Sequence, residues 1–121
     1  MHSVLAVDDS GSIRGLVSHV LQQAGYKVVL AEDGQEALDF AADNEVDVVL
    51  TDINMPRVDG IELIYGLRAM PHYKYVPMLE LTTESSQEMK MKGREAGATG
   101  WLVKPFDPDQ LVAVIKKVLP Q

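Results

Sequence analysis

Five short apolar segments, each followed by a stretch with helical periodicity, constrain the fold of this chain more than any other feature of its sequence. Several of these segments are rich in β-branched residues and nearly continuous in apolar character, which is typical of strands covered on both faces. The expected strands span residues 4–7, 27–31, 46–51, 76–82 and 100–104. Five strands that alternate with helices predict a parallel sheet with right-handed crossovers and helices on both faces, and therefore an α/β fold.

The intervening segments carry the signals of helices. Between residues 13 and 24 the apolar side chains recur three and four positions apart, and Gly25 is expected to end this helix as a C-terminal cap residue. The other helices are expected over residues 35–43, 60–69, 86–95 and 108–119. The fourth has few apolar residues on one face and contains Gly93, and glycine costs a helix interior about 1 kcal/mol relative to alanine. The sequence therefore predicts that the fourth helix is weakly anchored.

Length and composition narrow the class of protein. The chain has 121 residues, of which 46% are hydrophobic, and this suits one packed domain. A net charge of -7 argues against binding to nucleic acid, and no apolar run approaches the ~20 residues of a membrane span. The chain has no cysteine for disulfides or thiolate metal sites, and two acids by position 9 argue against a signal peptide. We expect a single cytoplasmic domain over residues 1–121, monomeric, without membrane insertion and without an output domain.

Polar side chains gather where the expected strands end. In an open parallel sheet, ligands bind at the carboxyl ends of the strands. The residues that follow or end the first, third, fourth and fifth strands are Asp8, Asp9, Asp52, Thr82, Thr83 and Lys104. Two carboxylates ~4 Å apart repel by about 4 kcal/mol at an effective dielectric of 20, so either one is protonated or a cation sits among them. Oxygen ligands without His or Cys favour Mg²⁺ or Ca²⁺ over zinc, and an open, phosphate-binding site favours Mg²⁺.

A lysine and a hydroxyl beside these acids favour phosphoryl chemistry. Lys104 supplies a fixed positive charge and Thr82 a donor, which prepares the site for additional negative charge. Asp52 is then the natural nucleophile, and it would form an aspartyl phosphate. Each feature alone has a commoner explanation, since a strand-end Asp often caps a helix. Their combination at one sheet edge favours the functional interpretation.

These features resemble the receiver domain of two-component response regulators, the CheY-like proteins, over the whole chain. The resemblance depends on the motifs VDDS, TDINMPRVDG, LTTESS and GWLVKPF, which lie at the first, third, fourth and fifth strands. It implies a flavodoxin-like, doubly wound, five-stranded parallel sheet of order 2-1-3-4-5 with five helices. By the same resemblance, Asp52 is the phosphorylation site and Thr82 and Lys104 contact the phosphoryl group. The implied Mg²⁺ ligands are Asp9, Asp52, the backbone carbonyl of Asn54 and, mainly through water, Asp8.

Further positions are implied to govern the switch and the phosphate lifetime. Trp101 stands at or next to the aromatic position that swings inward in the family, and Thr83 follows the switch threonine. Asn54 and Glu84 occupy the two positions that tune phosphate lifetime, and this pair predicts a lifetime of seconds to minutes.

The segment from Thr82 to Leu111 is most similar to stand-alone chemotaxis regulators. The resemblance implies a phosphorylation-activated response regulator that accepts its phosphoryl group from a CheA-like histidine kinase. It would then bind a FliM-like flagellar motor switch protein, or another phospho-dependent target, and control flagellar rotation. A phosphatase is a further partner that the resemblance allows. The protein would be no enzyme in the usual sense, because it catalyses only its own phosphorylation and dephosphorylation.

Two alternatives compete with this interpretation. An intermediate phosphate shuttle in a multi-step phosphorelay would need the same residues, and the sequence separates the two functions poorly. A metal-dependent phosphohydrolase is disfavoured, because such enzymes typically carry the nucleophile in a DxD pair after the first strand, whereas Asp8 and Asp9 are adjacent here.

Glu80 departs from the receiver pattern. It lies inside the fourth expected strand, where receivers usually carry an apolar residue. A buried carboxylate without a partner would have a raised pKa or would weaken the strand. We therefore expect Glu80 to be paired or partly exposed.

Overall fold

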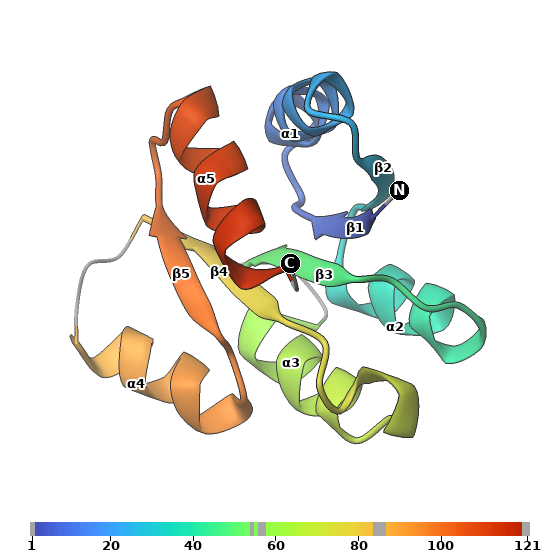
Figure 1. Ribbon diagram of the computed structural model, residues 1–121. Coiled ribbons are helices and arrows are strands. Elements are labelled where there is room, and N and C mark those ends of the chain that lie inside the picture. The colour runs from blue at the N-terminus through green and yellow to red at the C-terminus, as the bar shows by residue number, and fades with distance from the viewer. Residues whose placement is uncertain (1, 54, 56–57, 84–86, 120–121) are drawn as a thin grey trace.

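A computed structural model describes residues 2–53, 55, 58–83 and 87–119 (Figure 1). Its five strands are β1 (Ser3–Val7), β2 (Lys27–Ala31), β3 (Val48–Asp52), β4 (Met78–Thr82) and β5 (Gly100–Val103). They form one sheet of order β2-β1-β3-β4-β5, in which every neighbouring pair is parallel. The chain steps from β1 to β2 on one side and then to β3 on the other, so the strand order reverses between β1 and β3. This confirms the predicted doubly wound, flavodoxin-like fold.

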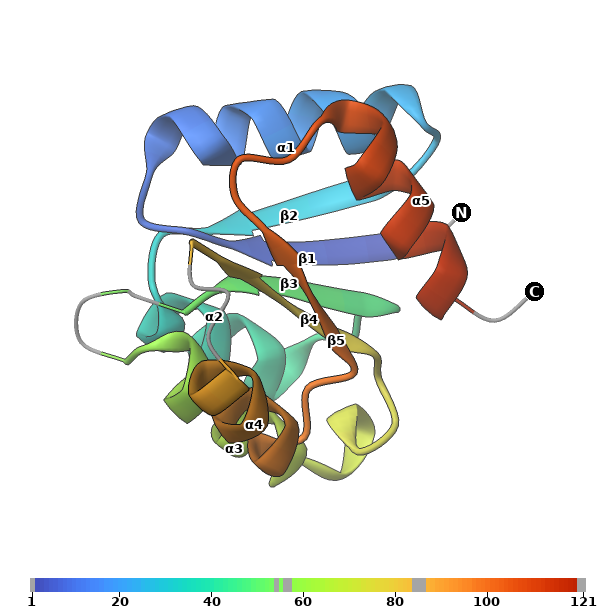
Figure 2. The ribbon, with the colours of Figure 1, turned by 90° about the vertical axis from the view of Figure 1, so that its left-hand side faces the viewer.

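Helices cover both faces of the sheet. They are α1 (Gly11–Gln23), α2 (Gly34–Asp43), α3 (Gly60–Arg68), α4 (Gln87–Ala96) and α5 (Pro108–Val118). Helices α1 and α5 lie on one face, and α2, α3 and α4 lie on the other (Figure 2). Side-chain oxygens of Ser10, Asp33, Asp59 and Asp107 cap the starts of α1, α2, α3 and α5. Within the described residues, no helix is long and apolar enough to span a membrane.

Each face of the sheet has its own hydrophobic core. Val4 and Leu50 pack with α1 and α5, whereas Leu5 and Val49 pack with α2 and α3, and all four are fully buried. Because successive side chains of a strand point to opposite faces, a strand covered on both sides is expected to be apolar along most of its length. This explains why the central strands read as continuous apolar runs. Burying one such side chain stabilises the fold by about 1.5–3 kcal/mol.

The element boundaries differ from the predictions in understandable ways. Strand β3 begins at Val48 and β4 at Met78, each two residues later than expected. Pro77 precedes β4, and proline has no N–H to donate to a strand ladder. A short 3-10 helix, η1 (Pro71–Tyr73), precedes β4 and was not predicted. Gly25 follows α1 with a φ of 96°, as expected for a helix-ending glycine.

The expectation for Glu80 was wrong. Its side chain is only 1% exposed, and its Oε1 has no hydrogen-bond partner within the described part of the chain. Gly93 of α4 lies directly over this carboxyl group, and a Cβ at that position would overlap with it. Gly93 therefore provides the space that Glu80 occupies, a role that its low helix propensity did not reveal.

Candidate functional site

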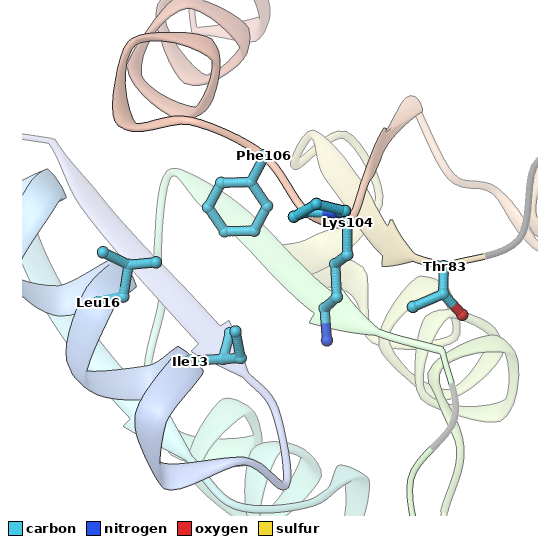
Figure 3. Close-up of a pocket in the computed structure, with 6 residues that line it drawn as sticks. Ile13, Leu16, Thr83, Lys104 and Phe106 are labelled. Atoms are coloured by element: carbon cyan, nitrogen blue, oxygen red, sulfur yellow. The ribbon is translucent and has the colours of Figure 1, made fainter.

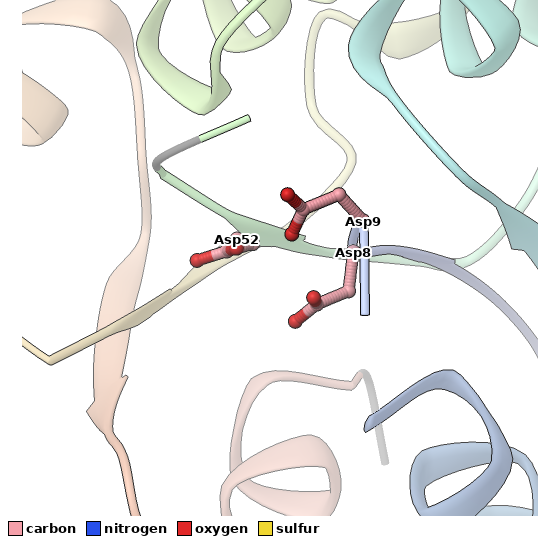
Figure 4. A group of neighbouring side chains, drawn as sticks. All are labelled: Asp8, Asp9 and Asp52. Carbon is pink, nitrogen blue, oxygen red and sulfur yellow. The ribbon is translucent and has the colours of Figure 1, made fainter. Parts of the chain in front are cut away.

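Three carboxylates meet where the strand order reverses. Asp8 and Asp9 follow β1, and Asp52 is the last residue of the neighbouring strand β3. Their side chains point into one space (Figure 4), and one oxygen from each lies within 4.8 Å of those from the other two. Asp8 and Asp52 are buried, whereas Asp9 is exposed. The sheet topology thus brings together acids that are more than forty positions apart in the sequence.

Lys104 closes the cluster from the β5 side. Its Nζ lies 2.9 Å from Oδ2 of Asp8 and 3.5 Å from Oδ1 of Asp52. The backbone N–H of Lys104 donates to the carbonyl of Thr82 at 2.7 Å, which fixes the lysine beside the end of β4, and the Lys104–Pro105 peptide bond is cis. The predicted lysine therefore faces the acids, and in this structure its shorter contact is with Asp8.

Within the described residues, the acids of the cluster outnumber the cations that contact them. Burial and the nearby charge of Asp8 raise the pKa of Asp52, and Lys104 offsets part of this effect. Burial acts to lower the pKa of Lys104, but its hydrogen bond to Asp8 and the charges of both acids outweigh burial and raise it. The N–H of Ile53 donates to Oδ1 of Asp52 at 2.9 Å. Among the residues that the structure describes, one lysine thus faces three carboxylates, and an additional cation would relieve this excess of negative charge.

The donor set fits a hard divalent cation. Every candidate ligand of the described cluster is a carboxylate oxygen, and such ligands favour Mg²⁺ or Ca²⁺. Asp8, Asp9 and Asp52 would hold the ion. The fourth predicted ligand, Asn54, lies outside the described residues, and so does the predicted lifetime residue Glu84.

The two threonines at the carboxyl end of β4 occupy different environments. Thr82 is buried at the end of β4, beside the backbone of Lys104, whereas Thr83 is exposed. Thr83 is one of the residues that line an apolar cavity of about 270 Å³ between α1 and the segment after β5 (Figure 3). The residues that line this cavity are Ile13, Leu16, Thr83, Lys104, Pro105 and Phe106. Sequence analysis missed the cavity, because it forms only where α1 packs beside the segment that follows Lys104.

Sequence analysis also missed Arg14. Its Nη1 donates to the backbone carbonyl of Asp8 at 2.8 Å, and its Nη2 lies 3.7 Å from Oε1 of Glu32. Oδ1 of Asp8 accepts from the N–H of Ser10 at 2.9 Å. These contacts hold the turn between β1 and α1 that presents the acids. A single arginine in the first turns of a helix carries no sequence signal for this role.

Trp101 lies in β5 and is neither fully buried nor fully exposed. Lys90 Nζ lies 4.7 Å from the centroid of its ring and Arg94 Cζ lies 5.9 Å from it, both within the range of cation–π contacts. Trp101 therefore links β5 to α4, next to the buried Glu80 that pairs with it in the strand register.

Comparison with known protein families and sequences gives a consistent picture. The chain matches the response regulator receiver domain family over residues 4–116. The transcriptional regulatory protein PrrA of Mycobacterium tuberculosis is 41% identical over 116 residues, which cover 96% of this chain and 49% of PrrA. The transcriptional regulatory protein CpxR of Escherichia coli is 35% identical over 119 residues, which cover 98% of this chain and 50% of CpxR. The chain thus spans about half the length of the curated relatives it matches.

Solved structures match this chain over nearly its whole length. The chemotaxis response regulator CheY4 of Vibrio cholerae superposes with a TM-score of 0.95 at 52% identity, over 98% of this chain and 99% of CheY4. The receiver domain of a sensor histidine kinase from Pseudomonas aeruginosa, described with a magnesium ion coordinated in its active site cleft, superposes with a TM-score of 0.89 at 28% identity. That match covers 96% of this chain and 95% of the other.

Proposed function

This chain belongs to the response regulator receiver domain family, and we propose that it accepts a phosphoryl group on Asp52 from a histidine kinase and signals by phosphorylation-dependent protein binding. One observation carries the proposal: Lys104 Nζ lies 2.9 Å from Asp8 and 3.5 Å from Asp52, in a cluster of three carboxylates. Such a site favours a ligand that brings both a cation and additional negative oxygens, and a phosphoryl group with Mg²⁺ is such a ligand.

In the proposed transfer, each described residue of the site has its own part. The N–H of Ile53 and the ammonium of Lys104 both approach Oδ1 of Asp52, so Oδ2 is the attacking oxygen. A bond forms from Oδ2 to phosphorus while the bond from phosphorus to the donor imidazole nitrogen breaks, and that nitrogen keeps the electron pair. Lys104 then exchanges a carboxylate oxygen for a phosphoryl oxygen. Hydrolysis of the acyl phosphate by water returns Asp52 and releases phosphate.

Two other groups complete the proposed site. Mg²⁺, when bound by Asp8, Asp9 and Asp52, would neutralise charge that develops on the phosphoryl oxygens. Thr82, buried at the end of β4, is the proposed hydroxyl donor to the phosphoryl group. In this proposal the protein acts on no separate substrate and catalyses only its own phosphorylation and dephosphorylation.

We propose chemotaxis as the setting, with a CheA-like kinase as donor and a FliM-like flagellar switch protein as target. The 52% identity to CheY4, which covers 99% of that chain, supports this assignment. A second candidate function is the receiver part of a transcriptional regulator, because PrrA and CpxR are described as such and are 41% and 35% identical. The net charge of -7 favours a protein rather than nucleic acid as the direct partner of this domain in either setting.

Trp101 fluorescence provides a test of the acceptor site. Addition of beryllofluoride with Mg²⁺ is expected to change the emission of the wild-type protein, because a phosphoryl analogue at Asp52 perturbs the neighbouring β4–β5 region. The Asp52→Asn variant is expected to give no change. Asp43→Asn, an identical substitution of an exposed acid on α2, serves as the matched control and should respond like the wild type. An equal response in Asp52→Asn would contradict the proposed site.

The partner requires a separate experiment. The phosphorylated protein is expected to bind a peptide from a flagellar switch protein more tightly than the unphosphorylated protein does, as measured by fluorescence anisotropy. Transfer of the phosphoryl group to a histidine phosphotransfer domain, without peptide binding, would instead support the phosphate shuttle. Equal binding of the two forms would contradict the chemotaxis assignment but not the assignment of Asp52.

A further inference from the structure

The carboxyl group of Glu80 lies inside the protein with one oxygen unpartnered. Glu80 is the central residue of β4, and only 1% of it is exposed. Among the described residues, no group donates a hydrogen bond to its Oε1 and no cation forms an ion pair with it. An ionised carboxylate in such a place is costly, whereas a neutral carboxylic acid is tolerated far better.

Helix α4 covers this carboxyl group at its one glycine. A Cβ at position 93 would overlap with Oε1, Oε2 and Cδ of Glu80, so the backbone of α4 sits directly on the acid. The far end of α4 is anchored separately, because the guanidinium of Arg68 donates to the carbonyl of Gly97 from both Nε and Nη2, at 3.1 and 2.7 Å. At Gly93, the contact of α4 with β4 therefore depends on whether the carboxyl group of Glu80 is protonated.

The groups around Glu80 explain why its charge is not compensated in this arrangement. Its register neighbour in β3 is Thr51, whose hydroxyl donates to the carbonyl of Asp52, and its neighbour in β5 is Trp101. The acid of β3 is Asp52, which stands beside Leu81 and not Glu80 in the strand register and adds no positive charge. On α3, Arg68 is engaged with backbone carbonyls.

The charges of α4 itself lie outside the buried space. Glu88 and Lys92 form an exposed pair at 3.3 Å, and Glu95 is exposed. The two remaining cations of the helix, Lys90 and Arg94, stand over the ring of Trp101. Trp101 is the register neighbour of Glu80, and Lys90 and Arg94 contact the ring of Trp101 and form no ion pair with Glu80.

We propose that Glu80 and Gly93 form a proton-dependent latch between β4 and α4. With the proton present, α4 packs on the neutral acid as observed. When the proton leaves to solvent, α4 moves off β4 until water, Lys90 or Arg94 reaches the carboxylate. The latch goes beyond the proposed phosphoryl chemistry and does not require it, since none of its residues belongs to the acid cluster.

The latch would respond near neutral pH. Burial raises the pKa of Glu80 to about 7. Below this pH the acid is neutral and α4 stays packed on β4, and above it the charged form favours the loosened helix. The two cations over the Trp101 ring belong to α4, so the surface that α4 forms with β5 would change together with the latch.

Nuclear magnetic resonance on the unphosphorylated wild-type protein tests the latch directly. The side-chain carboxyl ¹³C shift of Glu80 is expected to titrate with a midpoint near 7. Over the same range the amide protection factors of residues 87–96, corrected for intrinsic exchange, should fall about tenfold, whereas those of α2 should not. A Glu80 midpoint below about 5 would overturn the proposal, because such a carboxyl group is already charged when α4 is packed.

Two variants separate the latch from other titrations. Glu80→Gln keeps the shape of the side chain and removes its charge, so the protection of α4 should become independent of pH. Glu95→Gln makes the same substitution at an exposed position of α4 and should behave like the wild type. Unchanged pH dependence in Glu80→Gln, or its loss in Glu95→Gln, would contradict the latch.

Discussion

Replacement of Glu80 by glutamine should change how the stability of the whole domain depends on pH. The carboxyl group of Glu80 has its pKa raised by burial, so the folded protein binds this proton more tightly than the unfolded chain does. For an acid with a raised pKa, the wild type loses stability as pH rises from the unfolded value to the folded value and loses no more above it. Glutamine cannot ionise, so the variant lacks this loss.

The expected magnitude follows from the size of the shift. The pKa rises from 4.5 to about 7. Each pKa unit corresponds to about 1.4 kcal/mol, so complete ionisation costs the folded state about 3 kcal/mol. Between about pH 5 and about pH 8, the difference in unfolding free energy between variant and wild type should shift by about 2–3 kcal/mol in favour of glutamine. The buried glutamine amide also changes the unfolding free energy, but it does so equally at every pH and therefore does not affect this shift.

Urea denaturation at a series of pH values measures the shift. Subtraction of the wild-type curve from the variant curve cancels the titrations of Asp52, Lys104 and all other shared groups. Glu95→Gln should show no comparable shift, because that side chain is exposed. The reasoning would be refuted if the difference in unfolding free energy between Glu80→Gln and the wild type stayed constant with pH to within about 0.5 kcal/mol. Errors in additivity are of that size.

Three further predictions concern the site and the contact beneath α4. Lys104→Met should slow Mg²⁺-dependent phosphorylation by acetyl phosphate about 100-fold or more, because it removes a preorganised positive charge, and an unchanged rate would contradict its role. Mg²⁺ at 100 times its dissociation constant should raise the unfolding free energy by about 2.7 kcal/mol in the wild type and in Asp43→Asn. The increase in unfolding free energy on addition of Mg²⁺ should be much smaller in Asp9→Asn. An equal increase in this variant would show that the ion binds elsewhere. Gly93→Ala should destabilise the wild type by about 1–2 kcal/mol, because overpacking outweighs better helix propensity, yet should stabilise a Glu80→Ala background. The same sign in both backgrounds would disprove the contact.

Local sequence patterns were sufficient to predict the five strands and five α-helices of the fold, but not the short 3-10 helix η1. Except at Glu80 and at their carboxyl ends, β3 and β4 are apolar because helices cover both faces, and this made the strands recognisable from the order of residues alone. The strand order came from the resemblance to receiver domains and not from periodicity. The starts of β3 and β4 were placed too early, since Val46 and Val76 are apolar yet precede the ladder. Apolar character alone does not show where backbone pairing begins.

The candidate site was predictable for a topological reason. Asp8, Asp52 and Lys104 each stand at the end of a strand, and a parallel sheet brings such ends to one edge. Arg14 and the apolar cavity were not predictable in the same way. They depend on how α1 packs beside the segments that follow β1 and β5, and that packing leaves no mark in the spacing of the sequence.

The pairing of Glu80 with Gly93 could not be predicted from either residue alone. From the sequence, a glutamate inside a buried strand is expected to have a polar partner. A glycine inside a helix is expected only to weaken that helix. In the structure the glycine leaves room for the acid, so the two residues are complementary. A contact between residues thirteen positions apart on different elements requires tertiary information to recognise.

The most direct measurement is the chemical location of the phosphoryl group. The wild-type protein is incubated with acetyl phosphate and Mg²⁺, trapped by borohydride reduction and mapped by peptide mass spectrometry. The predicted result is reduction at Asp52 alone, dependent on Mg²⁺ and abolished by a chelator. Modification at another residue, or labelling at Asp52 that persists without a divalent ion, would contradict the assignment of the three carboxylates and Lys104 as a metal-assisted acceptor.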